Sequence, residues 1–237
     1  MFFCIFEDRM KKQPFMKKIV ILAALVFLSQ TVLTQVIGDQ TKRKFTIGLD
    51  IFSDIWQDLP ETMDEQTINP GVNIYGSYNY MIGKSNFSFS PGIGFGIHNL
   101  YSDTWPDLVN DSIAFIKFND TMDYKKSKLT ATYFDIPVEL RFKSKKDLRF
   151  AVGFKFGFLM KMQAKYKGED FMNNDDHTVI IKQGRIKYAE SNRYGFVARL
   201  GYKWFNLNGY YSLSSLFRED KGPEMYPISV GITIIPF

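Results

Sequence analysis

The sequence predicts an all-β fold, an eight-stranded antiparallel up-and-down transmembrane β-barrel preceded by a signal peptide. Three observations predict this fold. Apolar and polar residues alternate with a period of two over long segments. Short and long connections between these segments alternate along the chain. Aromatic residues make up 16% of the 237 residues, which is typical of barrels whose lipid-facing surface is flanked by aromatic girdles.

The N-terminal segment has the features of an export signal. Two lysines precede the apolar stretch Ile19–Leu28, and small and polar residues suited to cleavage near Thr34 or Gln35 follow it. The apolar stretch is too short to span a bilayer as a helix. We therefore expect a cleaved signal peptide, with an uncleaved N-terminal membrane anchor as the alternative.

Removal of this segment changes the charge of the chain. The expected domains are a signal peptide at residues 1–34, in which Met16 is an alternative start, and an outer-membrane β-barrel domain at residues 35–237. The formal net charge is +5 for the whole chain, and the 25 basic and 23 acidic residues of the barrel domain leave +2. A nearly neutral domain does not favour nucleic-acid binding. Cys4, the one cysteine, leaves with the signal, so no disulfide or cysteine metal site is expected.

The eight predicted strands share one apolar face and one polar or glycine-rich face. The clearest is the fifth, in which the even-numbered residues from Leu148 to Met162 are large and apolar, while the odd-numbered ones are mostly charged or small. A tilted strand needs roughly 9 to 11 residues to cross a bilayer, so this segment is long enough. In chain order the predicted strands are Phe45–Ile55, Val72–Ile82, Phe87–His98, Phe134–Phe142, Leu148–Gln163, Tyr194–Lys203, Phe205–Leu213 and Tyr226–Phe237.

Short and long connections alternate strictly between these strands. The short ones are expected as tight periplasmic turns, and they are Gly83–Asn86, Lys143–Asp147 and Trp204–Asn206. The long ones are expected as extracellular loops, and they are Trp56–Pro70, Asn99–Ser127, Tyr166–Asn192 and Ser214–Met225. This arrangement places both ends of the barrel domain in the periplasm and predicts an outer-membrane location.

The polar face of the strands predicts a charged lumen. An eight-stranded barrel has an interior just wide enough for side chains, and burying one charge without a partner is costly. We therefore expect a structural network of ion pairs, with a polar pore or proton path as the alternative. Its predicted members are Asp50, Asp135, Glu139, Arg141, Arg149, Lys155, Lys161, Arg199 and Lys203.

One segment carries a family resemblance. Tyr133–Phe142, with the sequence YFDIPVELRF, together with the signal peptide, the eight strands and the terminal Phe237, resembles the PorT-like outer-membrane β-barrel domain family of Gram-negative bacteria. The resemblance covers nearly all of the barrel domain and implies a link to secretion or transport. It also implies that the last strand, which ends at Phe237, is recognised by the barrel assembly machinery. Phe237 departs from the apolar phase of that strand unless Pro236 marks a bulge.

Catalytic and metal-binding constellations are nearly absent from the sequence. The two histidines are His98 and His177, and an enzyme acting on lipid would need His98 beside Ser88 or Ser90. The Asn173–His177 segment lacks the spacing of an EF-hand calcium loop and is expected as a solvated loop tip. We expect no catalytic site, cofactor or metal.

The strand pattern leaves one alternative fold and several alternative functions open. A soluble lipocalin-like barrel has the same strand pattern with its apolar face turned inward, so alternation alone does not distinguish it. The bulk of the apolar face favours the membrane barrel. The expected function is a non-enzymatic structural or interaction role through the long loops, with a secretion component, a lipocalin-like binding barrel and a lipid-modifying enzyme as alternatives. The expected partners are outer-membrane lipid, the assembly machinery and envelope or secretion proteins.

Overall fold

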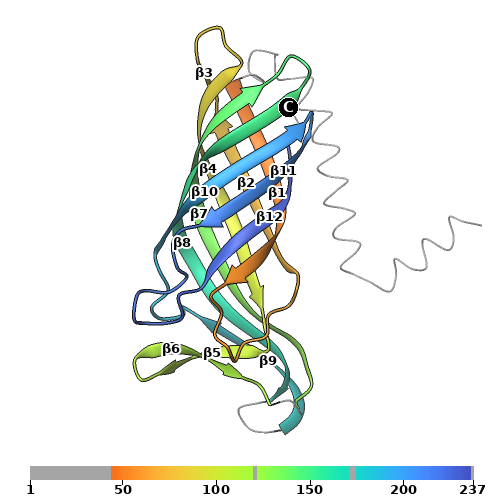
Figure 1. Cartoon of the computed structure of the whole chain (residues 1–237). Helices are drawn as coiled ribbons and strands as arrows, with labels where there is room; N and C mark the ends of the chain where they lie inside the picture. The colour runs from red at the N-terminus through yellow and green to blue at the C-terminus, as the bar shows by residue number, and fades with distance from the viewer. Residues whose placement is uncertain (1–43, 120–121, 171–174, 236–237) are drawn as a thin grey trace, which may run out of the picture. The chain divides into compact units, whose positions relative to one another are not determined.

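Eight antiparallel strands close into a barrel in the computed structural model, which describes residues 44–119, 122–170 and 175–235 (Figure 1). The predicted fold is confirmed. The barrel strands are β1 (Phe45–Gln57), β2 (Asn69–Tyr78) continued by β3 (Tyr80–Met81), β4 (Phe87–Tyr101), β7 (Tyr124–Lys143), β8 (Leu148–Asp170), β10 (Asn192–Tyr202), β11 (Phe205–Ser212) and β12 (Tyr226–Ile234). The predicted signal peptide, its start and cleavage sites, Cys4 and Phe237 lie outside the described residues.

Each barrel strand pairs with the barrel strand before it and the one after it, and the pairing of β1 with β12 closes the ring. β1 pairs with both β2 and β12, so the first and last strands lie side by side. β8 pairs with β7 on one side and with β10 on the other. Every pairing is antiparallel, as an up-and-down barrel with hairpin connections requires.

The two faces of the strands have opposite polarity. Side chains such as Ile93, Phe196 and Val230 point outward and are more than half exposed, whereas Glu139 and Arg199 are buried inside. An apolar exterior around a charged interior is the polarity of a membrane barrel, and it excludes the lipocalin-like alternative. Among the described residues, no helix is long and apolar enough to cross a membrane.

The predicted long loops between residues 99 and 127 and between 166 and 192 are partly wrong. β5 (Thr104–Val109) and β6 (Ser112–Lys117) form a hairpin in the first, and β9 (Asp175–Gly184) pairs with β8 in the second. β7 and β8 are 20 and 23 residues long, about twice the length needed to cross a bilayer. Their outer halves therefore continue beyond the lipid-facing band.

Polarity reverses where β7 and β8 leave that band. On β7 the outward residues change from Phe134 to Thr132 and Thr130, while the inward residues change from charged to Leu129 and Ala131. These outer halves lie outside the predicted strands because their alternation has the opposite sense, with polar residues outward and apolar residues inward.

On β8 the same reversal requires an extra residue. Tyr133 pairs with Leu159 and Thr132 with Lys161, so Met160 forms a β-bulge between them. The bulge shifts the phase by one residue and turns Met162 inward, where it is 3% exposed. The predicted uninterrupted alternation from Leu148 to Met162 is therefore wrong after Met160, where Lys161 is exposed and Met162 is buried.

The outer halves of β7 and β8 enclose an apolar core of their own, which we call the head. β9, the β5–β6 hairpin and the connections at the same end of the barrel complete it. Figure 1 shows these elements together at the end of the barrel opposite the β3 turn. Its buried core residues are Trp56, Met63, Leu100, Trp105, Ile113, Phe115, Phe118, Leu129, Ala131, Tyr133, Met162, Ala164, Tyr166, Ile186, Leu216, Phe217 and Met225.

Candidate functional site

The centre of the lumen is occupied by one arginine between two carboxylates. Arg199 on β10 donates from Nη1 to Asp50 Oδ1 on β1 at 2.5 Å and from Nε to Glu139 Oε1 on β7 at 3.1 Å. Thr233 and Asn73 also donate to the Asp50 carboxylate, at 2.7 and 2.8 Å. Because charge-assisted hydrogen bonds satisfy both carboxylates, the cost of burying them is offset.

Arg141 extends this cluster toward the end of the barrel that carries the β3 turn. Its Nε and Nη2 both lie 2.7 Å from Glu139 Oε2, and its Nη1 donates to Ser77 at 2.8 Å. The Tyr75 ring lies beneath both guanidinium groups, at 4.6 Å from that of Arg199 and 5.8 Å from that of Arg141. The aromatic face therefore adds a cation–π contact to the ion pairs.

A second cluster lies nearer to the head. Arg193 on β10 donates from Nη2 to both oxygens of Asp135 on β7, at 2.9 and 2.7 Å, and Lys155 Nζ on β8 lies 3.9 Å from the same carboxylate. Arg193 lies 3.8 Å from the centroid of the Tyr133 ring, and Lys155 lies 3.8 Å from that of Tyr210. Two cations thus surround one carboxylate, and each of them also contacts an aromatic face.

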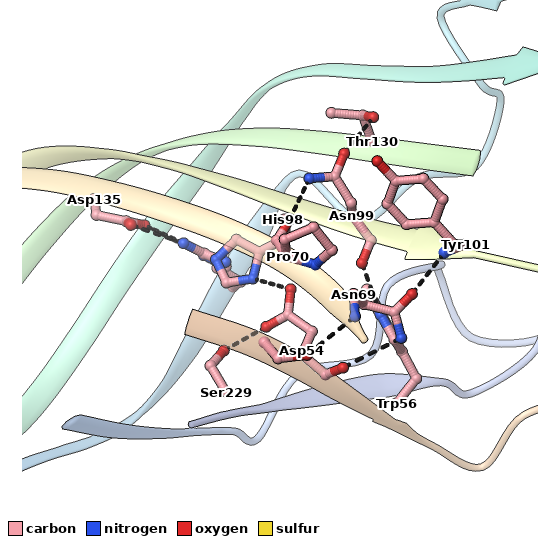
Figure 2. A network of polar contacts seen from close by, with 12 residues as sticks. Asp54, Trp56, Asn69, Pro70, His98, Asn99, Tyr101, Thr130, Asp135 and Ser229 are labelled. Atoms are coloured by element: carbon pink, nitrogen blue, oxygen red, sulfur yellow. Dashed lines mark hydrogen bonds and ion pairs between the residues drawn. The ribbon is translucent and has the colours of Figure 1, made fainter. Parts of the chain in front are cut away.

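The third cluster contains the one lumen histidine. His98 Nδ1 lies 2.8 Å from Asp54 Oδ2, and Ser229 donates to the other Asp54 oxygen at 2.6 Å. Figure 2 shows His98 on β4 directed at Asp54 on β1, with Asp135 further along the lumen. The contact crosses the lumen, since β2 lies between these two strands in the sheet. His98 is 1% exposed, and its ring packs against Phe52 at 4.8 Å between centroids.

Amide side chains join the strands where the lumen meets the head (Figure 2). Asn99 donates to the Pro70 carbonyl at 2.6 Å and accepts from Thr130 at 2.8 Å. Asn69 accepts from the Tyr101 amide at 2.7 Å, and Trp56 donates its indole N–H to the Asn99 carbonyl at 3.2 Å. These bonds provide a polar layer between the charged lumen and the apolar core of the head.

The structure brings six of the nine predicted network residues together: Asp50, Asp135, Glu139, Arg141, Lys155 and Arg199. Arg149 is half-buried beside this group and makes no ion pair within the described ranges. Two predictions were wrong. Lys161 points outward because the Met160 bulge reverses the phase of β8, and Lys203 lies exposed in the tight β10–β11 turn with a φ of 53°.

Three participants were missed in the sequence. Arg193, like Arg199, is an odd-numbered residue on the lumen face of its strand, but it lies one residue before Tyr194, where the predicted strand begins. Asp54 has the parity of Asp50, and His98 that of the inward glycines on β4. Extending the predicted strand Tyr194–Lys203 by one residue would have found Arg193, whereas Asp54 and His98 already lie on the polar faces of the predicted strands Phe45–Ile55 and Phe87–His98.

The predicted enzyme candidates are not assembled. Ser88 and Ser90 lie 3.4 Å from each other, and Ser90 donates to Asn79. His98 is on the same strand, eight residues from Ser90 or about 27 Å at strand spacing, and it contacts Asp54 instead. His177 lies in β9 rather than in a loop. Where the chain is described, no group of three or more His, Cys, Asp or Glu side chains is placed to hold a metal ion.

Ion pairs fasten the β5–β6 hairpin to the rest of the head. Lys221 Nζ lies 2.6 Å from Asp111 Oδ2 at the hairpin turn, and Tyr188 donates to the other Asp111 oxygen. These contacts hold the pKa of the Asp111 carboxyl below its ordinary value. At the base of the hairpin, Lys117 pairs with Asp64 and Asp103 at 2.7 and 3.0 Å, which raises the pKa of the Lys117 ammonium.

Comparisons with known proteins agree with this architecture. A family model described as outer membrane protein beta-barrel domain matches residues 44–218. A comparison with curated proteins finds no match. One solved structure that matches is the crystal structure of Ail, the attachment invasion locus protein of Yersinia pestis, in complex with the heparin analogue sucrose octasulfate. It has a TM-score of 0.37 and 10% identity over 81% of this chain and 97% of that chain, and so distant a likeness carries no functional argument.

Proposed function

The chain belongs to the outer membrane protein beta-barrel domain family, and on that premise we propose that it is a non-enzymatic interaction barrel of the outer membrane that contacts partners through its head. In such barrels the longer connections face the cell exterior, so the head is extracellular. The single observation that carries the proposal is the buried apolar core of the head, in which Leu100, Phe217 and Met225 are at most 2% exposed. A barrel needs no such core to close its strands, whereas a binding surface needs a rigid support.

The lumen supports an interaction role rather than transport through the barrel. Asp50, Glu139, Asp135 and their cationic partners fill its cross-section from several strands. A path for solute would have to break ion pairs that are buried on all sides. We therefore expect no steady ion conductance from the purified protein in a planar lipid bilayer.

The β5–β6 hairpin offers the most direct contact surface on the head. Its turn residues Asn110 and Asp111 both have positive φ, as a two-residue type I′ hairpin requires. Leu108, Val109 and Ile116 are 40 to 49% exposed on it. Apolar side chains presented on a braced hairpin are suited to contact another surface.

Replacing the hairpin tests the proposal. Cells that express the intact protein, or a variant in which residues 104–117 are replaced by a short Gly-Ser linker, would be applied to immobilised polysaccharides and matrix proteins. The matched control replaces the turn at residues 144–147 at the other end of the barrel. We expect retention on at least one surface that is lost only in the hairpin variant, while heat-modifiable migration on gels remains. Equal retention of all three cell lines would contradict the proposal.

A secretion role is the second candidate, and it rests on the resemblance of Tyr133–Phe142 to PorT-like barrels. The two acidic residues of that segment, Asp135 and Glu139, support the ion-pair clusters of the lumen. Because both carboxylates are needed inside the barrel, their presence in the segment does not require a secretion partner. Cross-linked co-purification of periplasmic or inner-membrane secretion components, retained in the hairpin variant, would favour this candidate over the first.

A further inference from the structure

The outward face of β7 and β8 changes from apolar to polar and basic between one row of paired residues and the next row toward the head. Phe95, Phe134 and Phe158 form an aromatic row across β4, β7 and β8. The next row toward the head contains Thr132 and Lys161. Rows on one face of a sheet are two residues apart, about 7 Å, so Lys161 lies at the level where lipid headgroups replace acyl chains.

A hollow lies beside Lys161 because two strands share the same edge of β8. β10 pairs with β8 as far as Phe158, and β9 pairs with it from Gln163 onward. The residues between them are the bulged segment, and the chain turns away at Arg185, whose φ is 56°. The resulting hollow has a volume of about 500 Å³ and is lined on its charged side by Lys161 and Arg185.

The hollow combines positive charge with apolar surface. Neither Lys161 nor Arg185 forms an ion pair in the described part of the chain. The nearby carboxylate of Glu190 accepts from the Ser191 and Asn192 amides, at 2.9 and 3.3 Å. Met160, 63% exposed, also lines the hollow next to Phe158 of the lipid-facing row. An occupant therefore needs an anionic group with an apolar portion on the membrane side.

A row of lysines continues the basic surface above the hollow. Lys128, Lys165 and Lys182 are directly paired across β7, β8 and β9, and Tyr101 on β4 completes the row. Like charges directly opposite each other destabilise a sheet. Lys128 lies beyond the lipid-facing band, and burial together with Lys126 and Lys165 lowers the pKa of its ammonium to about 8. An anion bound across the row would relieve this repulsion.

We propose that this flank, with Lys161 and Arg185 at the hollow and the lysine row above it, binds the phosphate groups of anionic glycolipids in the outer leaflet. The position favours a lipid over a soluble polyanion, because the basic surface lies on the side of the barrel and continues its lipid-facing face. The inference goes beyond the proposed function, since it concerns the flank of the protein and not the hairpin of the head.

The test measures lipid retained by the full mature chain. Protein reconstituted in phosphatidylcholine vesicles with added lipopolysaccharide would be extracted in mild detergent, washed, and assayed for lipopolysaccharide per protein. We expect the variant K161Q/R185Q to retain roughly tenfold less, in line with the loss of two basic groups at an anionic surface, and K161R to retain the normal amount. K128Q/K165Q/K182Q should lose retention as well. The matched control is K84Q/K145Q/K146Q, which removes three exposed lysines from the turns at the opposite end.

Three outcomes would overturn the proposal. One is unchanged retention by K161Q/R185Q, and a second is equal retention of chemically dephosphorylated lipopolysaccharide. The third is binding of heparin that depends on these lysines without any retention of lipopolysaccharide, which would identify a soluble polyanion as the ligand. Heat-modifiable migration of every variant shows that the barrel is folded, so loss of retention reports on the site itself.

Discussion

Arg199 and Asp50 lie 149 residues apart in the chain and meet inside the barrel, with Arg199 Nη1 at 2.5 Å from Asp50 Oδ1. Their strands, β10 and β1, are not neighbours, since β11 and β12 lie between them. The same guanidinium reaches Glu139 on β7. One side chain therefore links three separate strands across the lumen, and it should contribute to stability more than any surface ion pair.

Arg199→Ala should destabilise the barrel strongly, because it leaves the Asp50 and Glu139 carboxylates buried without their shared partner. Removing one member of a buried ion pair typically costs about 3 to 5 kcal/mol. The free energy of unfolding would be measured by urea titration in detergent, followed by heat-modifiable migration. Lys203→Ala, in an exposed turn, is the control and should change it by less than about 0.5 kcal/mol. Equal effects of the two substitutions would remove the central role assigned to Arg199.

Asp135 and Arg193 should show strong coupling in a double-mutant cycle. Asp135→Asn leaves Arg193 without its carboxylate, and Arg193→Met leaves Asp135 with only Lys155 at 3.9 Å. The double variant removes both charges, so its loss of stability should be smaller than the sum of the single losses by about 1 to 3 kcal/mol. Additive losses in the same urea titration would show that the pair acts through packing alone.

Gly157 should tolerate no side chain, because it lies against this pair. A Cβ atom at position 157 would lie 2.5 Å from Asp135 Oδ1 and 2.7 Å from Arg193 Cγ. Gly157→Ala should therefore displace the ion pair and cost about 1 to 3 kcal/mol. Gly209→Ala is the matched control, since a Cβ at that strand position meets nothing within 4 Å. A Gly157 variant as stable as the Gly209 variant would show that the pair adjusts freely.

The membrane part of the barrel was predictable because one simple rule holds there: apolar residues face lipid and polar residues face the lumen. That rule located all eight strands and six of the nine lumen residues. It failed at Lys161 and in the head, where the outside is water and the inside is apolar. A strand with apolar residues outward and a strand with apolar residues inward have the same alternating sequence pattern. The pattern of one strand therefore does not show which of its faces points outward. The pairing of Asp54 with His98 depends on strand register, which the pattern of either strand alone does not specify.

The reversal at Met160 predicts opposite effects for two adjacent residues. Uninterrupted alternation would place Lys161 in the lumen and Met162 in lipid, whereas the structure exposes Lys161 and buries Met162 in the head core. Lys161→Leu should leave the free energy of unfolding in detergent nearly unchanged. Met162→Lys should lower it by several kcal/mol, because it buries a charge without a partner. The reverse order of effects would contradict the bulge.

The contact of Asp111 with Lys221 should make the hairpin sensitive to acid. Hydrogen bonds from Lys221 and then Tyr188 hold the pKa of Asp111 below its ordinary value of 3.8. A lowered acid pKa gives a stabilisation that is fully present above 3.8 and is lost as the pH falls through the pKa of the folded state. Cleavage of the hairpin by pepsin should therefore rise steeply between about pH 4 and pH 2, beyond the change in pepsin activity on a denatured substrate.

Two variants of the hairpin separate the contribution of Asp111 from that of other carboxylates. Asp111→Asn should raise cleavage at pH 4 and make cleavage depend less on pH, whereas Asp107→Asn on the same hairpin should preserve the pH dependence. An unaltered profile for Asp111→Asn would mean that the backbone bond from the Ile113 amide to the Lys221 carbonyl, at 2.9 Å, is sufficient to hold the hairpin in place.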